Sequence, residues 1–357
     1  MGSKKDKGDT NVPFKTIEAI LAYLYPAASF LIVCTYAFVM VLGLFLFFLT
    51  PEGLEFSSKN ILSLNLYLFY ISALKISGPI SVGTFFFFLT IIFSLAFIIT
   101  ALTNRRYDLS VKDLVHSREI KKATSNFLLF MPALTSAAFF SFTVIHLVLQ
   151  EIGIPIGETP FADPFQGVLF TSYAALIEEV SFRLVPLAFP VAVYLLFFAS
   201  PTLSKFNPKK RSMLTILALF KPSSFQERLS LSLGKPFLAF KITLILVSAT
   251  AFALAHLTTG TWQVGKLSTT FLAGLLLGYC CIKFGFESAI LIHWFFNSYW
   301  SILSLGGVMS GTFSTLLNAF NFITLYIGLI TLGVFFYLFS FKTASFFMQH
   351  KRKTHLC

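Results

Sequence analysis

Residues 80–102 read ISVGTFFFFLTIIFSLAFIITAL and contain no charged side chain. A transmembrane helix needs about 20 consecutive apolar residues, so this stretch predicts a helix that spans a bilayer. The whole chain has the same character, because 56% of its 357 residues are hydrophobic and only 12% are charged. Soluble domains carry about 25% charged residues. The composition therefore excludes a soluble protein and predicts an all-α polytopic membrane protein.

Other apolar runs of similar length bring the prediction to about eight transmembrane helices. Together with 80–102, they lie near 22–50, 126–150, 166–189, 237–257, 267–283, 288–305 and 313–341. The stretch 61–79 contains Lys75, Gly78 and Pro79, and we interpret it as an interfacial or re-entrant segment. The segment 187–200 is too short to cross alone. It is expected to continue the fourth span after a kink at Pro186 and Pro190.

Basic residues are concentrated in the N-terminus, the loop 103–125, the loop 201–236 and the C-terminus. The loop 151–165 instead holds three acidic residues and no basic one. Eight spans place every basic region on one side of the membrane and the acidic loop on the other. Since basic loops stay in the cytoplasm, both termini are expected there. The chain is thus predicted to be a multi-pass protein of the cell membrane.

The same bias explains the formal net charge of +12 without a nucleic acid partner. The chain divides into three predicted parts, which are a tail with two helices and a basic loop (1–125), a membrane domain (126–341) and a basic tail (342–357). Within the membrane domain, 201–236 is interpreted as a basic cytoplasmic loop insertion. It either sets the topology as a solvated loop or binds anionic lipid headgroups.

Polar side chains inside the predicted spans are concentrated in three places, which read IEEVSFR, FALAH and HWFFN. Ionisable groups at membrane depth cost several kcal/mol or more each, so each indicates a function or a partner. The candidate site residues in these three segments are Glu178, Glu179, Arg183, Phe252, His256, His293 and Asn297.

Helical spacing separates the two glutamates. Glu179 lies four residues before Arg183, on the same face of the helix, so the two can pair. Glu178 points about 100° away and needs a partner from another helix. This division is typical of a structural ion pair beside a working carboxylate.

The histidines and the asparagine suggest complementary tasks. His293 and Asn297 are four residues apart and can donate two hydrogen bonds to a carbonyl oxygen that becomes negative during hydrolysis. His256 can share the proton of an attacking water with Glu178. Phe252, one turn before His256, is expected to be a packing wall of the site.

In this order, Glu178-Glu179-x-x-x-Arg183, Phe252-x-x-x-His256 and His293-x-x-x-Asn297 resemble the CPBP family of CAAX proteases and bacteriocin-processing enzymes. That family is also called Abi or type II CAAX prenyl endopeptidase Rce1-like. The resemblance covers about 165–305 and implies an eight-helix intramembrane glutamic endopeptidase without a metal or another cofactor. It implies that Glu178 and His256 activate water, that His293 and Asn297 form the oxyanion site, and that the remaining motif residues support them.

The implied substrate is a membrane-embedded or lipid-anchored protein, for example of the CAAX type, within the lipid bilayer. Three other functions stay open. The chain could be a non-proteolytic scaffold or immunity-type protein of the same fold, or a zinc-dependent protease with Glu178, His256 and His293 as ligands. A channel or transporter is the third, and the lack of an internal repeat disfavours it.

Two features depart from the family pattern. The interval between Glu178 and His256 is longer, and its extra length is the loop 201–236. In addition, counting along the spans places His256 near the outer end of its helix and His293 nearer the inner end. A common site then requires tilted helices or a turn at Gly285 that is sunk into the protein.

Overall fold

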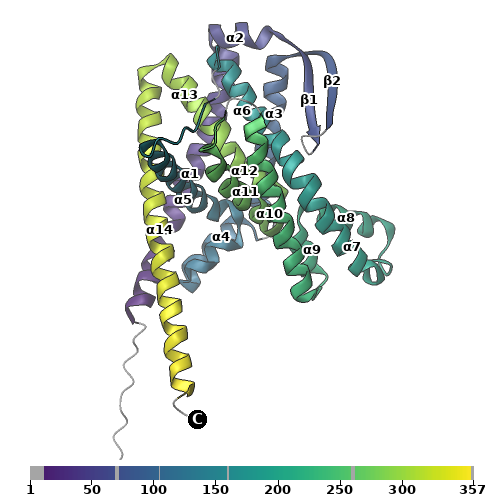
Figure 1. The fold of residues 1–357 in the computed structure, drawn as a ribbon, viewed down its shortest axis with the longest axis vertical. Helices are drawn as coiled ribbons and strands as arrows, with labels where there is room; N and C mark the ends of the chain where they lie inside the picture. Colours follow the sequence, from purple (N-terminus) through teal and green to yellow (C-terminus); the bar gives the residue numbers. More distant parts are fainter. Residues whose placement is uncertain (1–11, 69–71, 104, 159–160, 259–261, 355–357) are drawn as a thin grey trace, which may run out of the picture.

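The computed structural model describes residues 12–68, 72–103, 105–158, 161–258 and 262–354. Nearly all of them are helical (Figure 1). The α-helices are α1 (Val12–Leu49), α2 (Pro51–Ser58), α3 (Val82–Leu102), α4 (Tyr107–Ser117), α5 (Phe127–Glu151), α6 (Pro164–Glu179), α7 (Phe189–Leu203), α8 (Pro208–Phe220), α9 (Pro222–Arg228), α10 (Gly234–Thr258), α11 (Lys266–Phe284), α12 (Phe286–Trp294), α13 (Trp300–Met309) and α14 (Gly311–Thr354). A 3₁₀-helix, η1 (Ile120–Ser125), and two π-helices, η2 (Val180–Ala188) and η3 (Phe295–Tyr299), join them.

Within the described residues, seven helices are long and apolar enough to cross a membrane. They are Thr16–Leu49, Val82–Leu102, Phe127–Glu151, Pro164–Leu203, Gly234–Thr258, Lys266–Phe284 and Gly311–Ser340. Each coincides with one of the predicted spans. Their outer faces carry large exposed apolar side chains such as Leu49, Phe197 and Phe336, which suit contact with lipid. The all-α polytopic membrane fold is confirmed.

The remaining predicted span, 288–305, differs from the other seven in character. It lies in α12, η3 and α13, which follow one another without a break from Phe286 to Met309. Polar residues such as His293 and Asn297 lower its hydropathy, and every residue of α12 is buried. Because α3, α6 and α11 pack around it, this helix crosses the centre of the bundle and has no need of a lipid-facing surface.

The described residues of the stretch 61–79 form two paired strands. Strand β1 (Asn60–Leu68) pairs antiparallel with β2 (Ser72–Ser81), and the register shifts near Gly78 and Pro79. Pro79 cannot donate to a ladder, which is consistent with an irregular position there. The segment is therefore not a full helical span, and the paired strands satisfy their backbone groups without a re-entrant helix.

The fourth span continues beyond Pro186, as predicted. Residues Pro164–Leu203 form one continuous helical stretch of 40 residues, in which Pro186 lies inside π-helix η2. At about 1.5 Å per residue this stretch is about 60 Å long, twice the thickness of a hydrocarbon core. Its last part, α7, therefore extends past the bundle toward α8 and α9 (Figure 1).

The segment 201–236 is more ordered than the loop that the sequence predicts, although most residues of α8 are exposed. It contains helices α8 and α9, which pack on α7 around a separate cluster of buried side chains. Leu214, Ala218 and Phe225 belong to this cluster and are almost inaccessible to solvent. The spacing of Leu214 and Ala218 places both on one helical face, and burial of that face holds α8 against the bundle.

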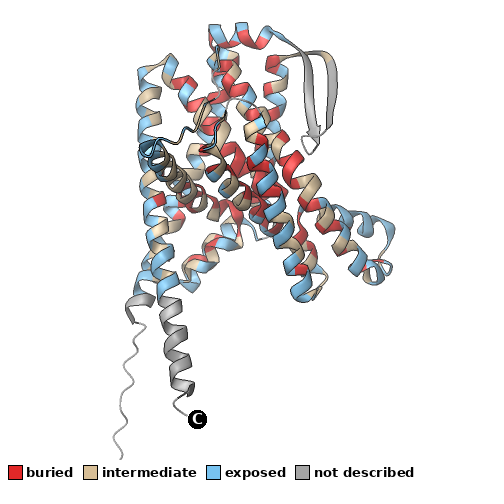
Figure 2. Cartoon of the chain, viewed as in Figure 1, coloured by how far each residue is buried: buried red, intermediate tan, exposed pale blue. Residues whose placement is uncertain are grey.

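The basic regions lie at one end of the bundle. In Figure 1, the start of α1, the end of α14, and helices α4 and α9 occupy the lower end, whereas α2 and α13 occupy the upper end. Figure 2 shows the buried positions gathered between these ends, where α6, α10, α11 and α12 meet. The start of α1 and the end of α14 lie at the same end of the bundle, as expected for an even number of crossings.

This arrangement predicts that Ser117 in α4 and Glu158 in the acidic loop face opposite sides of the membrane. Both residues are exposed. After replacement of Cys34 and Cys357, single Ser117→Cys and Glu158→Cys variants should react with an impermeant thiol reagent from opposite sides of intact cells or spheroplasts. The positive-inside rule places Glu158 outside. Labelling of both variants from the same side would contradict the topology.

Candidate active site

The three polar segments converge although they lie on separate helices. Glu178 and Glu179 are the last two residues of α6, and Arg183 follows in η2. Phe252 and His256 lie in the last two turns of α10. His293 is in α12 and Asn297 in η3. Helices α6, α10, α11 and α12 contact one another, directly or through η2, and this packing brings the segments together.

Both π-helices lie at the site. A π-turn widens the helix and frees backbone carbonyls from their usual partners, and such turns often occur at functional sites. In η2, the carbonyl of Phe182 accepts a hydrogen bond from Ser248 Oγ of α10. In η3, Tyr299 is held by Thr35 of α1 at 3.1 Å between the hydroxyl oxygens. These bonds from neighbouring helices fix the two irregular segments and the polar residues on them.

Glu179 and Arg183 form an ion pair that is wholly inside the protein. Both side chains are 0% exposed, and Arg183 Nη1 lies 3.5 Å from Glu179 Oε1. The guanidinium carbon of Arg183 also lies 4.1 Å from the ring centroid of Phe252, a cation–π contact. The predicted pairing along the helix is therefore present, and Phe252 covers the charge of Arg183.

His293 joins this pair, which the sequence did not indicate. Its Nδ1 lies 2.7 Å from Glu179 Oε1. A carboxylate oxygen accepts hydrogen bonds, so Nδ1 is the donor in this bond. This bond fixes the orientation of the imidazole ring. Glu179 thus holds two site residues at once, Arg183 along its own helix and His293 across to α12.

Glu178 has a different environment. Its Oε2 lies 3.5 Å from His293 Nε2 and accepts no hydrogen bond from the described residues, although the atom is buried. The partner on another helix that the sequence required is therefore His293. His256, which the sequence placed beside Glu178, binds the carbonyl oxygen of Phe252 through Nδ1 at 2.9 Å. A neutral His256 consequently carries its lone pair on Nε2.

One cavity of about 630 Å³ brings the four predicted catalytic side chains together. Glu178, His256, His293 and Asn297 all line it. A second cavity of about 220 Å³ shares the two histidines and Asn297 and extends toward α5. Glu179 and Arg183 line neither cavity. The geometry therefore separates a cavity-facing carboxylate from a buried ion pair behind it.

The difference in depth between His256 and His293 is explained by the turn at Gly285, which is sunk into the protein. Phe284, Phe286 and Glu287 around it are buried. Gly285 has φ +116°, and a Cβ there would lie 2.6 Å from Glu287 Oε2, so a side chain is excluded. Helix α12 therefore starts inside the bundle, and His293 lines the same cavity as His256.

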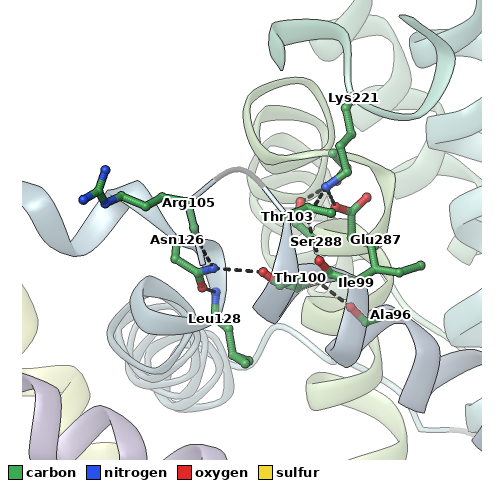
Figure 3. Close-up of polar contacts among 11 residues, drawn as sticks. Ala96, Ile99, Thr100, Thr103, Arg105, Asn126, Leu128, Lys221, Glu287 and Ser288 are labelled. Atoms are coloured by element: carbon green, nitrogen blue, oxygen red, sulfur yellow. Dashed lines mark hydrogen bonds and ion pairs between the residues drawn. The ribbon is translucent and has the colours of Figure 1, made fainter. Parts of the chain in front are cut away.

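Lys221, which lies between α8 and α9, makes polar contacts beside this turn (Figure 3). The ammonium group of Lys221 forms an ion pair with Glu287 and donates a hydrogen bond to Thr103 Oγ1. Ser223 Oγ donates to the carbonyl of Ile282 at 2.8 Å. The basic segment that lengthens the interval between Glu178 and His256 thus supports the start of α12.

Several cavity residues were missed by the sequence reasoning. Lys266, at the start of α11, lines both cavities, and Trp262 and Thr171 line the larger one. Thr171 also accepts a hydrogen bond from Asn297 Nδ2 through its carbonyl, at 3.4 Å. His146 of α5 lines the smaller cavity and contacts Thr269 Oγ1 at 2.9 Å. Lys266 had a usable signal, because it is a charged residue directly beside an apolar span.

The zinc alternative finds no ready set of ligands. In the part of the chain that the structure describes, no three His, Cys, Asp or Glu side chains are grouped so that they could hold a metal ion. His293 Nδ1 is engaged by Glu179.

Comparison with known families identifies the same segment. Residues 160–299 match a family model described as Type II CAAX prenyl endopeptidase Rce1-like. The chain carries an Rce1-like segment. The match confirms the resemblance, extends from α6 to the end of η3, and includes all seven candidate site residues. No curated protein and no solved structure matches the chain. At the level of the family, the Rce1-like match supports a CAAX-type intramembrane protease.

Proposed function

We propose that the chain is an intramembrane endopeptidase that hydrolyses a peptide bond of a membrane-embedded or lipid-anchored protein with water activated by Glu178 and His256. The observation that carries this proposal is the cavity that Glu178 shares with both histidines and Asn297. The buried Oε2 of Glu178 accepts no hydrogen bond from the described residues and lies beside three side chains suited to hydrolysis. A scaffold has no need for such an arrangement. The Rce1-like match supports the same class of reaction.

In this mechanism, Glu178 takes a proton from water while the water oxygen bonds to the carbonyl carbon of the substrate. His256 orients that water through Nε2. Negative charge develops on the carbonyl oxygen, and donors on His293 and Asn297 stabilise it. The carbon–nitrogen bond then breaks, and the leaving amine takes the proton that Glu178 holds. A carboxylic acid and an amine are the products.

His293 has one additional requirement in this role. Its Nδ1 already donates to Glu179, so Nε2 can donate to the oxyanion only when both ring nitrogens carry protons. Ionised Glu179 compensates the added positive charge at 2.7 Å. Glu179 and Arg183 are therefore positioning residues, because they act through His293 and do not line the cavity.

The proposal predicts hydrolysis without a metal. Purified protein in non-ionic detergent should cleave a transmembrane or lipid-anchored peptide, and strong chelators should not change the rate, because a carboxylate is the general base. Asn297→Ala should lower kcat by about 10²–10³, the usual effect of losing one oxyanion donor. Asn297 gives a cleaner test than His293, whose removal would also leave buried Glu179 unpaired.

Ser301→Ala is a matched control for Asn297→Ala. Ser301 lies on the same helical stretch as Asn297 and also contacts Thr171, at 3.1 Å, but it does not line the cavity. Loss of activity on chelation with recovery on addition of zinc would replace the glutamate mechanism with a metal-dependent one. Absence of cleavage for all membrane peptides tested would favour the scaffold function.

A further inference from the structure

Lys266 is a charged residue in the cavity to which the proposed mechanism gives no task. It is the first residue of α11 and is half-buried. It lines the larger cavity with Glu178 and His256, and the smaller one with His256, His293 and Asn297. The ammonium-bearing side chain therefore borders the space in which a substrate must lie.

No carboxylate among the described residues lies within ion-pair distance of Lys266. Its recorded side-chain contact is with Trp262, where Nζ lies 4.1 Å from the ring centroid. Glu158 lines the same cavity but forms no ion pair with it. Glu178 also lines this cavity without an ion pair to Lys266. An ammonium group at the membrane boundary that faces a cavity and has no direct ion-pair partner is costly, so it indicates a ligand.

The backbone around Lys266 is fixed. Gln263 N–H donates to the carbonyl of Ile156 at 2.9 Å, and Gly265 N–H donates to the carbonyl of Pro155 at 3.0 Å. A Cβ on Gly265 would lie 2.8 Å from the Pro155 carbonyl oxygen, so only glycine permits this approach. These two hydrogen bonds join the segment before α11 to residues Pro155 and Ile156, and so hold the backbone next to Lys266 in place.

The cation–π contact also restricts the side chain. Trp262 lines the larger cavity, and its ring holds the Lys266 ammonium group from one side. The N-terminus of α11, which begins at this residue, adds partial positive charge. An anionic group in the cavity would therefore meet a positioned ammonium ion in a site of low dielectric, where charged hydrogen bonds are strong.

We propose that Lys266 binds a carboxylate of the substrate and so selects which peptides enter the cavity. This inference rests on the proposed function. The cavity volume of about 630 Å³ is within the range of about 300–1,000 Å³ that small-ligand pockets occupy. A carboxylate held at Lys266 and a peptide carbonyl at His293 and Asn297 therefore belong to one short peptide segment. The nearest source of such a group is the free C-terminus of the substrate.

The test compares matched peptides that end in a free carboxylate or in an amide. For the wild-type protein, the acid should have a kcat/KM about 10–100-fold higher than that of the amide, mainly through KM, because the amide cannot form the charged hydrogen bond. Lys266→Met should bring this ratio close to one, and Lys266→Arg should restore part of it. Lys283→Met, at the exposed far end of the same helix, should keep the wild-type ratio.

A binding measurement separates this inference from the proposed function. In the Glu178→Gln background, the acid peptide should bind at least ten-fold more tightly than the amide, and Lys266→Met should abolish the difference. Equal binding of both peptides would overturn the role of Lys266 even for an active protease. If the acid peptide bound selectively but the wild-type protein, with Lys266 intact, cleaved neither peptide, the protease mechanism would be overturned instead.

A third peptide identifies the source of the carboxylate. It is amidated at the C-terminus and carries a glutamate side chain near that end. Lys266-dependent preference for this peptide alone would assign the contact to a side chain and overturn recognition of the C-terminus. If the preference for the acid peptide disappeared only when anionic lipid was added, a lipid headgroup would be competing for Lys266. That result would support an anion site there.

Discussion

Glu178→Gln should lower kcat by about 10²–10⁴ while the protein remains folded. The amide has nearly the same shape as the carboxylate but cannot take a proton from water, which removes general-base catalysis. Glu178 lines the larger cavity, and its Oε2 accepts no hydrogen bond from the described residues. Its replacement therefore breaks no buried hydrogen bond. Turnover of a membrane peptide and the melting temperature in detergent are the two measurements.

Glu158→Gln is the matched control, because Glu158 lines the same cavity but is exposed and has no contact with His293. Its kcat should stay close to that of the wild type. If Glu178→Gln kept wild-type turnover, the general base would be another group, and the glutamate mechanism would be abandoned. A large drop in melting temperature for Glu178→Gln would show that its role is structural.

Glu179→Ala should instead lower the free energy of unfolding by about 3–5 kcal/mol, because it leaves a buried guanidinium without its counter-charge. Arg183 is 0% exposed, and Glu179 Oε1 is its ion-pair partner at 3.5 Å. The same change also releases His293 Nδ1. Detergent-extracted yield and the unfolding transition, measured by heating or by denaturant, should both report the loss.

A double variant distinguishes charge from packing. Arg183→Met removes the unpaired charge but keeps much of the side-chain volume, so Glu179→Ala with Arg183→Met should be more stable than Glu179→Ala alone. The double variant should still have reduced kcat, because His293 has lost its orienting partner. Equal destabilisation by Glu178→Gln and Glu179→Ala would contradict the division of roles between the two glutamates.

The membrane fold could be predicted from the sequence because bilayer thickness fixes the length of an apolar span. Seven helices coincide with predicted spans for this reason. The paired strands at Asn60–Ser81 and the helices α8 and α9 could not be predicted in the same way. Their formation depends on strand pairing and on burial against α7, and neither contact can be read from the length and hydropathy of an apolar run.

For the candidate site, the spacing of Glu179 and Arg183 was sufficient to predict their ion pair, since residues four apart share a helical face. The polar residues in three separate spans also pointed to one cavity. Spacing could not show that His293 lies between the two glutamates, or that Lys266 borders the same space. Distances between helices depend on tilt and packing, which leave no periodic signal.

The sequence by itself determined which segments enter the membrane and which side chains in them are costly to bury, because both follow from local composition and helical period. The tertiary structure alone decided the depth of the site. The turn at Gly285 lies inside the bundle, covered by the Lys221–Glu287 contact, and His293 lines the same cavity as His256. The physical reason is that burial of this turn depends on the segment where α8 and α9 meet, which approaches the turn only after the chain has folded.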